Sequence, residues 1–400
     1  MSEITTTELT ETLSPGLLRN EIDRRIVKIR PSSTPLDQIS RMAGARHAAS
    51  MKVDYYSVDL KSGTSEINGN YPKRTCQKDE PVTVKVKDSS FLSESDTVLF
   101  PNVKTPDGHS FIGYVTKCDG YNISFVPANI SLNDDDEYDI PAMNNATPVV
   151  RMGRAAGELD VQTPQFVALP VKKNNYCQIF KAQIEESLLQ RLSDKEVGWT
   201  FSDQEEAAIL DMRMCMERSF LFGVKNKLTL TADNKEIMLT GGIWHQAEKE
   251  YVYTPSELSN QTIVSMLRKA FTDSNGSKRK ILIGGSGLIE SLNRLELGHV
   301  LIGSQHVTKW GVDFECIVSK FGSLYVIHSE MFDLCGMPDH GMVIDPEYIT
   351  KYSHIPFSAN RISFHKQGVR NTEAVVLTEA SCLVLRYPKA HMRIVPAVNG

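Results

Sequence analysis

The pattern with the clearest chemical potential is a glycine-rich turn, GGSG at 284–287, between a predicted buried strand at 280–283 and a helical stretch. Backbone N–H groups at the start of a helix attract anions, so this turn could cradle a phosphate. However, it lacks the Gly-Lys-Ser/Thr ending of a P-loop and the GxGxxG spacing of a dinucleotide site. Leu288 stands where a GxSxG nucleophile elbow requires glycine. The pattern favours a tight strand-to-helix turn.

Histidine, cysteine and acidic residues supply the other candidates for chemistry. Cys335 and His340 share a glycine-rich loop, but a nucleophile and its base seldom come so close in sequence. The acidic run at 133–137 lacks the late Glu of a calcium loop and is typical of a solvated loop. The basic residues at 278–280 are interpreted as a solvated cluster. The scattered histidines show no HExxH-like spacing; they are His245, His299, His306, His328, His340 and His354. We therefore expect no catalytic, cofactor-binding or metal-binding residue and no cofactor, and we predict that the protein is not an enzyme.

Composition narrows the class of protein further. The chain has 400 residues, of which 41% are hydrophobic and 23% charged, which is typical of a globular protein. Its length predicts two or three domains, or one body with large insertions. The net charge of −5 argues against a basic surface that coats nucleic acid. Seven cysteines without CxxC spacing indicate reduced thiols in a cytosolic setting, with neither a zinc ribbon nor a disulfide framework. We expect no signal peptide, and no apolar run approaches the ~20 residues of a membrane helix.

The elements that must carry these residues begin with an arm. Residues 1–35 are predicted to be extended, either as a disordered tail or as an arm ordered against a neighbouring subunit. A short helix is expected at 36–50. Short strands with alternating apolar and polar residues between about 80 and 150 predict a small antiparallel sheet or barrel. Residues 151–175 are predicted to form a projecting hairpin or loop.

The clearest predicted helix is 203–222. Ser202 and Glu205 match a capping box, and Gly223 stands where a C-terminal cap belongs. The apolar residues expected on one face are Ala207, Leu210, Met214 and Leu221. Further helices are expected at 179–192 and 255–272, a buried strand at 280–283, and a return to β structure in the C-terminal third.

Four stretches together resemble the major capsid proteins of tailed phages with the Hong Kong 97-type fold. They are NYCQIF at 175–180, the capped helix at 203–222 with Glu217, GMVIDPE at 341–347, and LVLRYPKAH at 383–391. None is specific alone, but their order and spacing match that family over roughly 150–400.

The resemblance implies an α+β fold with five parts. They are an N-terminal arm at 1–50, an extended loop at 51–175 with a β-rich insertion at about 80–150, a peripheral domain at 176–224 containing the spine helix, an axial domain at 225–370, and closing strands of the peripheral domain at 371–400.

The implied function is a major capsid protein that forms hexamers and pentamers in the icosahedral shell around a phage double-stranded DNA genome. Assembly would occur in the host cytoplasm, and the protein would reside in the virion. Expected partners are other copies of the chain, portal, scaffolding and decoration proteins, and weakly contacted DNA, with no membrane partner. Two alternatives stay open: an encapsulin-like compartment shell, and an α+β enzyme or ligand-binding protein.

Overall fold

The computed structural model describes residues 34–397 except 43, 58–62, 79, 134–136, 159–169, 194–199, 231–234, 273–275, 295–303, 310, 311, 367 and 369. Contacts divide the chain into two compact units. The first contains the segments up to Ser57 and from Lys172 onward, and the second runs from Val58 to Val171. Residues 1–33 of the predicted arm lie outside the described residues.

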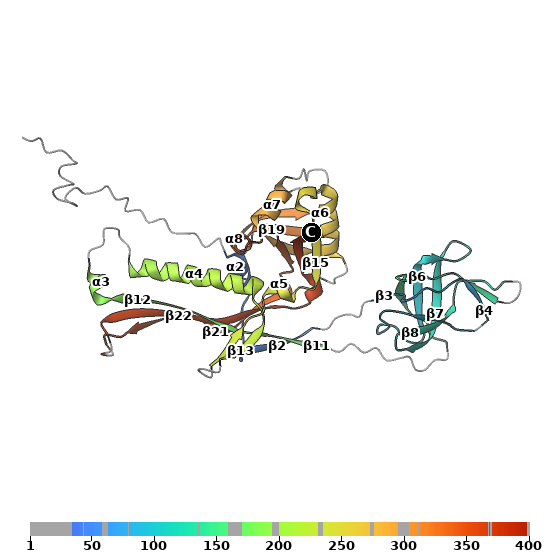
Figure 1. Ribbon diagram of the computed structural model, residues 1–400, viewed down its shortest axis with the longest axis horizontal. Coiled ribbons are helices and arrows are strands. Elements are labelled where there is room, and N and C mark those ends of the chain that lie inside the picture. The colour runs from blue at the N-terminus through green and yellow to red at the C-terminus, as the bar shows by residue number, and fades with distance from the viewer. Residues whose placement is uncertain are drawn as a thin grey trace, which may run out of the picture. The chain divides into compact units, whose positions relative to one another are not determined.

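One sheet of the first unit has four strands in the order β1-β21-β22-β12. These strands are β1 (Arg46–His47), β12 (Gln178–Ser187), β21 (Ile349–Ser363) and β22 (Thr372–Leu385). Phe180 of β12 is buried against Phe220 of α4 (Phe201–Phe222), with ring centroids 5.8 Å apart. The long helix α4 therefore lies along this sheet (Figure 1). The short helix α2 (Pro35–Met42) contacts α4 and β21, and the short helix α3 (Leu188–Leu192) contacts β12.

A seven-stranded mixed sheet follows in the order β15-β23-β20-β16-β19-β18-β17. Its strands are β15 (Lys249–Tyr253), β16 (Arg279–Gly284), β17 (Ser304–Lys309), β18 (Val312–Val318), β19 (Ser323–His328), β20 (Gly341–Ile344) and β23 (Met392–Pro396). The helical segments around it are α5 (Ile243–Gln246), η2 (Pro255–Glu257), α6 (Asn260–Phe271), α7 (Ser286–Asn293), α8 (Glu330–Leu334) and η4 (Pro388–Ala390).

Both faces of this sheet are covered because successive residues of a strand point in opposite directions. Leu282 of β16 belongs to an apolar cluster with α6 and α7 (Figure 1). Its neighbours Ile281 and Ile283 belong to the other large cluster, with residues of α4, α5 and α8. The predicted buried strand at 280–283 is thus confirmed, and it links two layers of the core.

Two ribbons complete the first unit. β2 (Lys52–Ser57) pairs with β11 (Val171–Tyr176), and β13 (Asn226–Leu230) pairs with β14 (Lys235–Leu239). The second ribbon is a hairpin in which every described residue is exposed or half-buried.

The second unit is an antiparallel β domain. A six-stranded sheet in the order β3-β10-β6-β7-β8-β5 stands beside the two-stranded sheet β4-β9. The strands are β3 (Thr64–Glu66), β4 (Arg74–Gln77), β5 (Val82–Lys85), β6 (Asp96–Lys104), β7 (Ser110–Asp119), β8 (Asn122–Pro127), β9 (Glu137–Ile140) and β10 (Pro148–Arg154). Phe100, Phe111 and Phe125 are fully buried in its centre, so the small antiparallel sheet predicted from alternation is present.

The expected helix at 179–192 is wrong. Residues 178–187 form β12, and only 188–192 are helical. The segment IFKAQIEES has helix-forming residues, but all ten residues of β12 pair with β22, and this non-local pairing overrides local propensity.

The cap and buried face of the long helix also need correction. Thr200 is the N-cap, and its capping box partner is Asp203, not the expected pair of Ser202 and Glu205. The buried residues of α4 are Met212, Met216, Glu217, Phe220 and Leu221. Of the four residues expected on one face, Leu221 is buried and Met214 is partly buried against the core, whereas Ala207 is exposed. The cap at Gly223 is confirmed.

Two other helices differ at their ends. The helix expected at 36–50 is α2, which ends at Met42, and the one expected at 255–272 begins at Asn260, after its N-cap Ser259. Sheet pairing also crosses the predicted domain boundaries, because β21 pairs with β22 whereas β23 joins the seven-stranded sheet.

Candidate functional site

Three of the sequence stretches singled out above meet inside the first unit. Asn175, 1% exposed, lies at their junction at the end of β11. Its Nδ2 donates hydrogen bonds to the carbonyls of Leu383 (2.8 Å) and Gly241 (3.0 Å), and its Oδ1 accepts the N–H of Gly241 (2.8 Å). One buried amide therefore joins the 175–180 stretch to the 383–391 stretch and to the loop that follows β14.

The 341–347 stretch contacts the 383–391 stretch through a buried histidine. The backbone N–H of Asp345 donates to Nδ1 of His391 over 3.1 Å, and Nε2 of His391 donates to the carbonyl of Arg386 over 3.2 Å. Both ring nitrogens are thus used by the neutral imidazole. Burial lowers the pKa of His391 to about 3. The carboxylate of Asp345 in turn accepts the N–H and hydroxyl of Ser277.

Lys280 corrects the expectation of a solvated basic cluster at 278–280. Its side chain is fully buried at the start of β16. The ammonium group donates to the carbonyls of Ala270 and Ala390, each over 2.7 Å, and lies 5.6 Å from the ring centroid of Phe271. Burial lowers the pKa of Lys280 to about 8. In the sequence, the signal that this lysine is buried is its position directly before the apolar residues 281–283.

A second set of buried charges joins α2 to α4 and to the four-stranded sheet. Nζ of Lys351 lies 2.8 Å from Oδ1 of Asp37 and 2.8 Å from Oε1 of Glu379. Oδ2 of Asp37 also accepts from Arg213 and Arg41, each at 3.0 Å. Each of these buried ions has an oppositely charged partner, which offsets the cost of removing it from water.

Glu217 belongs to the same set and caps α2 from a distance. Its two carboxylate oxygens accept the N–H of Leu36 (2.7 Å) and of Asp37 (2.6 Å), which lie in the first turn of α2. Burial raises the pKa of Glu217 to about 8, against the effect of these two hydrogen bonds. The two N–H donors favour the charged carboxylate, as at other helix N-termini. Glu217 therefore attaches the segment that follows the N-terminal arm to the long helix.

The carboxylate of Asp333 accepts hydrogen bonds from the glycine-rich turn at 284–287. Asp333 Oδ1 accepts from the N–H (2.9 Å) and the hydroxyl (2.7 Å) of Ser286, and Asp333 Oδ2 lies 2.8 Å from Nε2 of His328. The aspartate stands between serine and histidine, which is not the order of a catalytic triad. A Cβ at Gly285 would lie 2.5 Å from the carbonyl oxygen of Pro338. These contacts support the tight-turn interpretation.

The remaining described candidates lie apart from one another in the first unit. His245 is exposed, His354 Nδ1 lies 2.8 Å from the Ala48 carbonyl, and His340 lies against Trp244 with ring centroids 5.8 Å apart. Cys335 is exposed. His299, the side chain of His306 and the acidic positions 134–136 lie outside the described residues. Within the described part of the chain, no group of three His, Cys, Asp or Glu side chains is placed to hold a metal ion, and no helix is both long and apolar enough to cross a membrane.

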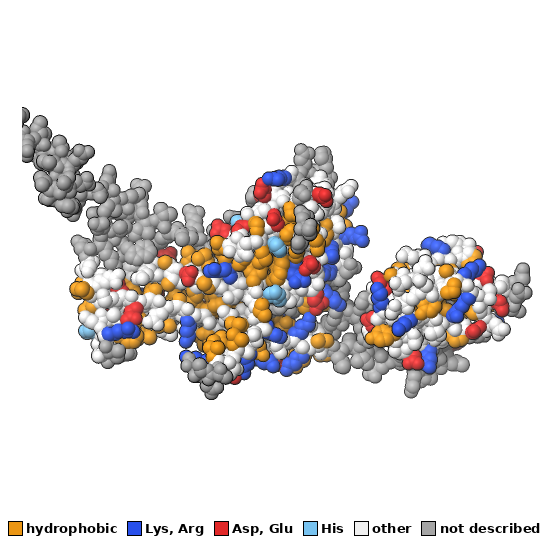
Figure 2. Space-filling view, viewed as in Figure 1, with side chains coloured by type: hydrophobic (Ala, Val, Ile, Leu, Met, Phe, Trp, Pro, Cys, Tyr) orange, Lys and Arg blue, Asp and Glu red, His pale blue; other side chains and the backbone are white. Residues whose placement is uncertain are grey.

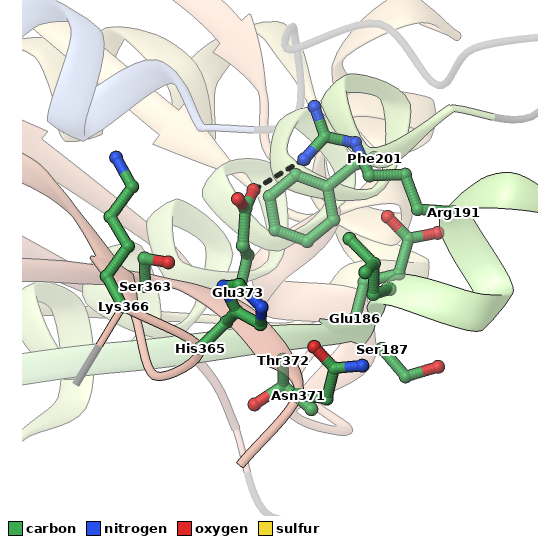
Figure 3. A pocket seen from close by; sticks show the side chains of 11 residues that line it. Glu186, Ser187, Arg191, Phe201, Ser363, His365, Lys366, Asn371, Thr372 and Glu373 are labelled. Carbon is green, nitrogen blue, oxygen red and sulfur yellow. Dashed lines mark hydrogen bonds and ion pairs between the residues drawn. The ribbon is translucent and has the colours of Figure 1, made fainter. Parts of the chain in front are cut away.

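Two hollows lie among the described residues of the first unit. One, of about 70 Å³, lies among the ends of β12, β21 and β22 and the adjoining helices. There Arg191 contacts Glu373 over 2.6 Å beside Phe201 (Figure 3). This hollow is far smaller than the ~300 Å³ of the smallest usual ligand pockets.

The second hollow, of about 470 Å³, is open and lined partly by lysines near β11. Lys172 lies 2.8 Å from Asp54, and Lys173 lies 3.1 Å from Glu248. These acidic partners offset the positive charge that an anion would need.

Comparison with known proteins identifies the family to which the chain belongs. The chain matches the family described as SU10 major capsid protein over residues 3–397. No curated protein matches it significantly. Among solved structures, it is similar to a capsid chain of an empty GTA particle, with 8% identity, coverage of 97% of this chain and 99% of that chain, and a TM-score of 0.49. A chain from Mycobacterium phage Bobi has 8% identity, coverage of 98% of both chains, and a TM-score of 0.48. A chain of the SrpI encapsulin complex from Synechococcus elongatus PCC 7942 has 9% identity, coverage of 57% and 77%, and a TM-score of 0.38.

The family match over residues 3–397 places the chain in the class of major capsid proteins. Its fold is α+β, with a long helix along one sheet and a mixed sheet that follows. More particularly, the chain belongs to the SU10 major capsid protein family. It forms the icosahedral shell of the phage, is located in the virion, and associates with copies of itself. These predictions from the sequence are confirmed.

Proposed function

We propose that this capsid subunit acts without catalysis and contacts its neighbours in hexamers and pentamers through the apolar face of the β13–β14 hairpin. The observation that supports the proposal is the two-faced character of this hairpin. Leu228 and Leu230 point to one face of β13; Ile237 is the direct cross-strand partner of Leu228, and Lys235 that of Leu230 at the end of the hairpin. All three are exposed, by 39%, 46% and 39%.

The opposite face of the hairpin is ionic. Lys227 and Glu236 form an ion pair of 2.9 Å there, with Thr229 next to them along the strand. An isolated two-stranded hairpin is marginally stable in water, and an apolar face of this kind usually marks an interaction site. Figure 2 shows hydrophobic side chains gathered over the hairpin. A second copy of the chain is the occupant proposed, because the family assembles from identical subunits.

Leu230→Asn tests this proposal, with Thr229→Asn as the matched control on the ionic face. Burial of one leucine side chain contributes about 2 kcal/mol, and every copy in the shell would lose it. The concentration needed for assembly should therefore rise at least tenfold for Leu230→Asn and stay near the wild-type value for Thr229→Asn. Sedimentation and negative-stain microscopy measure the particles. Wild-type assembly by Leu230→Asn would exclude this face as a contact.

The proposal also covers the domains, the partner proteins and the contact with DNA. The unit at 58–171 is proposed as a domain inserted in the extended loop, β12, α4, β21 and β22 as the peripheral domain, and the seven-stranded sheet as the axial domain. Portal, scaffolding and decoration proteins are the proposed partners besides further copies of the chain. DNA is proposed to be contacted weakly, since a net charge of −5 offers little attraction to phosphate.

A further inference from the structure

Two buried thiols face each other across the sheet of the first unit. Cys177 immediately precedes β12, and Cys382 lies in β22. Each is 0% exposed, and the two Sγ atoms are 3.6 Å apart. Gln178 pairs with Ser381 in the antiparallel register, so Cys177 and Cys382 occupy the next opposed position. Directly opposed residues have Cα atoms about 4.5–5.5 Å apart, within the range of about 4.4–6.8 Å that disulfides bridge.

The two thiols are not equivalent. The contact between the two sulfurs lowers the pKa of Cys177, and the same contact together with burial raises the pKa of Cys382. Cys177 is thus the sulfur that reaches the thiolate form more readily, and the thiolate is the reactive species. The surrounding cluster is apolar and includes Val53 and Tyr55 of β2, so only a small oxidant can reach the pair through local opening.

We infer that Cys177 and Cys382 are a redox-sensitive pair that a hydroperoxide converts into an intrachain disulfide. The Cys177 thiolate attacks one peroxide oxygen, and the O–O bond breaks. With hydrogen peroxide, the displaced hydroxide takes the proton that the thiol released, giving water and a sulfenic acid on Cys177. The sulfur of Cys382 then attacks the Cys177 sulfur and displaces hydroxide, which takes the Cys382 proton. Overall, two thiols are oxidised by two electrons, and one peroxide is reduced to two waters.

The bond would act where the β2–β11 ribbon joins the four-stranded sheet. Cys177 lies between β11 and β12, while Val53 and Tyr55 of β2 contact the same cluster as Cys382. A link between Cys177 and Cys382 would fix this junction and close a loop between positions 205 residues apart. Closure of a long loop restricts the unfolded chain strongly. The oxidised subunit should therefore unfold at a higher temperature than the reduced one.

Peptide mapping of the full-length protein, as assembled particles, tests the inference. Particles are treated with hydrogen peroxide, and the free thiols are alkylated after denaturation. We expect a linked peptide pair containing Cys177 and Cys382, lost on reduction, and a thermal midpoint several degrees higher that returns to the untreated value with dithiothreitol. Cys177→Ser and Cys382→Ser should each abolish both effects. Cys316→Ser, which also changes a buried cysteine, should retain both.

The inference is overturned if the wild-type pair is recovered as two alkylated or separately over-oxidised cysteines under peroxide. It is also overturned if the linked pair forms without any change in the thermal midpoint, because the bond would then not constrain the junction. Neither result depends on variants that fold poorly, since both are read from the wild-type chain. Particle formation by negative stain reports separately on the proposed hairpin contact.

Discussion

Single buried ionisable residues hold distant parts of this chain together. The carboxylate of Glu217 would be costly in an apolar core if it were alone. It accepts two N–H groups from α2 instead, and Lys351 bridges Asp37 to Glu379 next to it. Loss of one partner from such a set leaves an uncompensated buried charge. The polar chemistry of the first unit therefore positions segments of the chain.

His391 gives this packing a pH dependence. Its pKa is lowered to about 3, by burial and by the nearby Lys280 ammonium, whereas the unfolded chain has the ordinary value near 6.5. Between these values the unfolded state binds more protons, so acidification favours unfolding. The stability that neutral His391 supports is complete above about pH 6.5 and is lost progressively as the pH falls towards 3.

Urea unfolding of unassembled subunits between pH 7 and pH 4.5 checks this prediction. A single group of this kind contributes a slope of up to ~1.4 kcal/mol per pH unit, in addition to that of the carboxylates. His391→Gln should show a shallower slope than the wild type, whereas the exposed control His245→Gln should match the wild type. Equal slopes for all three proteins would contradict the role given to His391.

At the scale of elements, the sequence at the start of α4 offers two possible N-terminal caps. Ser202 with Glu205 and Thr200 with Asp203 both have capping-box spacing, and the structure uses Thr200. Thr200→Ala removes the side-chain acceptor for the N–H of Asp203 and should lower the free energy of unfolding by about 1 kcal/mol. Ser202→Ala, the matched control, should change it by less than ~0.5 kcal/mol. Chemical denaturation measures both, and a larger loss for Ser202→Ala would favour the cap inferred from the sequence.

The elements also show how far sequence reasoning reached. Strands with clean alternation, such as β5 and β7, were predicted because one buried face suffices to define them. β12 was not, because its strand state depends on ten pairings with β22, almost two hundred residues later in the chain. Lys351 and Glu379 were missed as partners for the same reason, although Glu379 interrupts a strand-like apolar run. No single-chain pattern shows which two charges will meet.

For the whole molecule, the two units have separate apolar cores. The second unit buries residues between Ile67 and Val149, and the clusters of the first unit contain none of them. In the second unit, Phe100 lies 5.4 Å from Phe111 and 5.3 Å from Phe125, measured between ring centroids. The separation of the cores predicts that damage to one unit stays within it.

Phe100→Ala tests this independence, with Phe220→Ala in the first unit as its counterpart. Truncation of a fully buried phenylalanine costs about 3–5 kcal/mol, so exchange-protected amides of the affected unit should open far more often. Hydrogen exchange followed by mass spectrometry should show faster exchange for Phe100→Ala in peptides of 63–157 and wild-type exchange in β12, α4 and β22. Phe220→Ala should show the reverse, because Phe220 packs on Phe180 of β12. Faster exchange throughout the chain in both variants would mean that the two units unfold as one cooperative body.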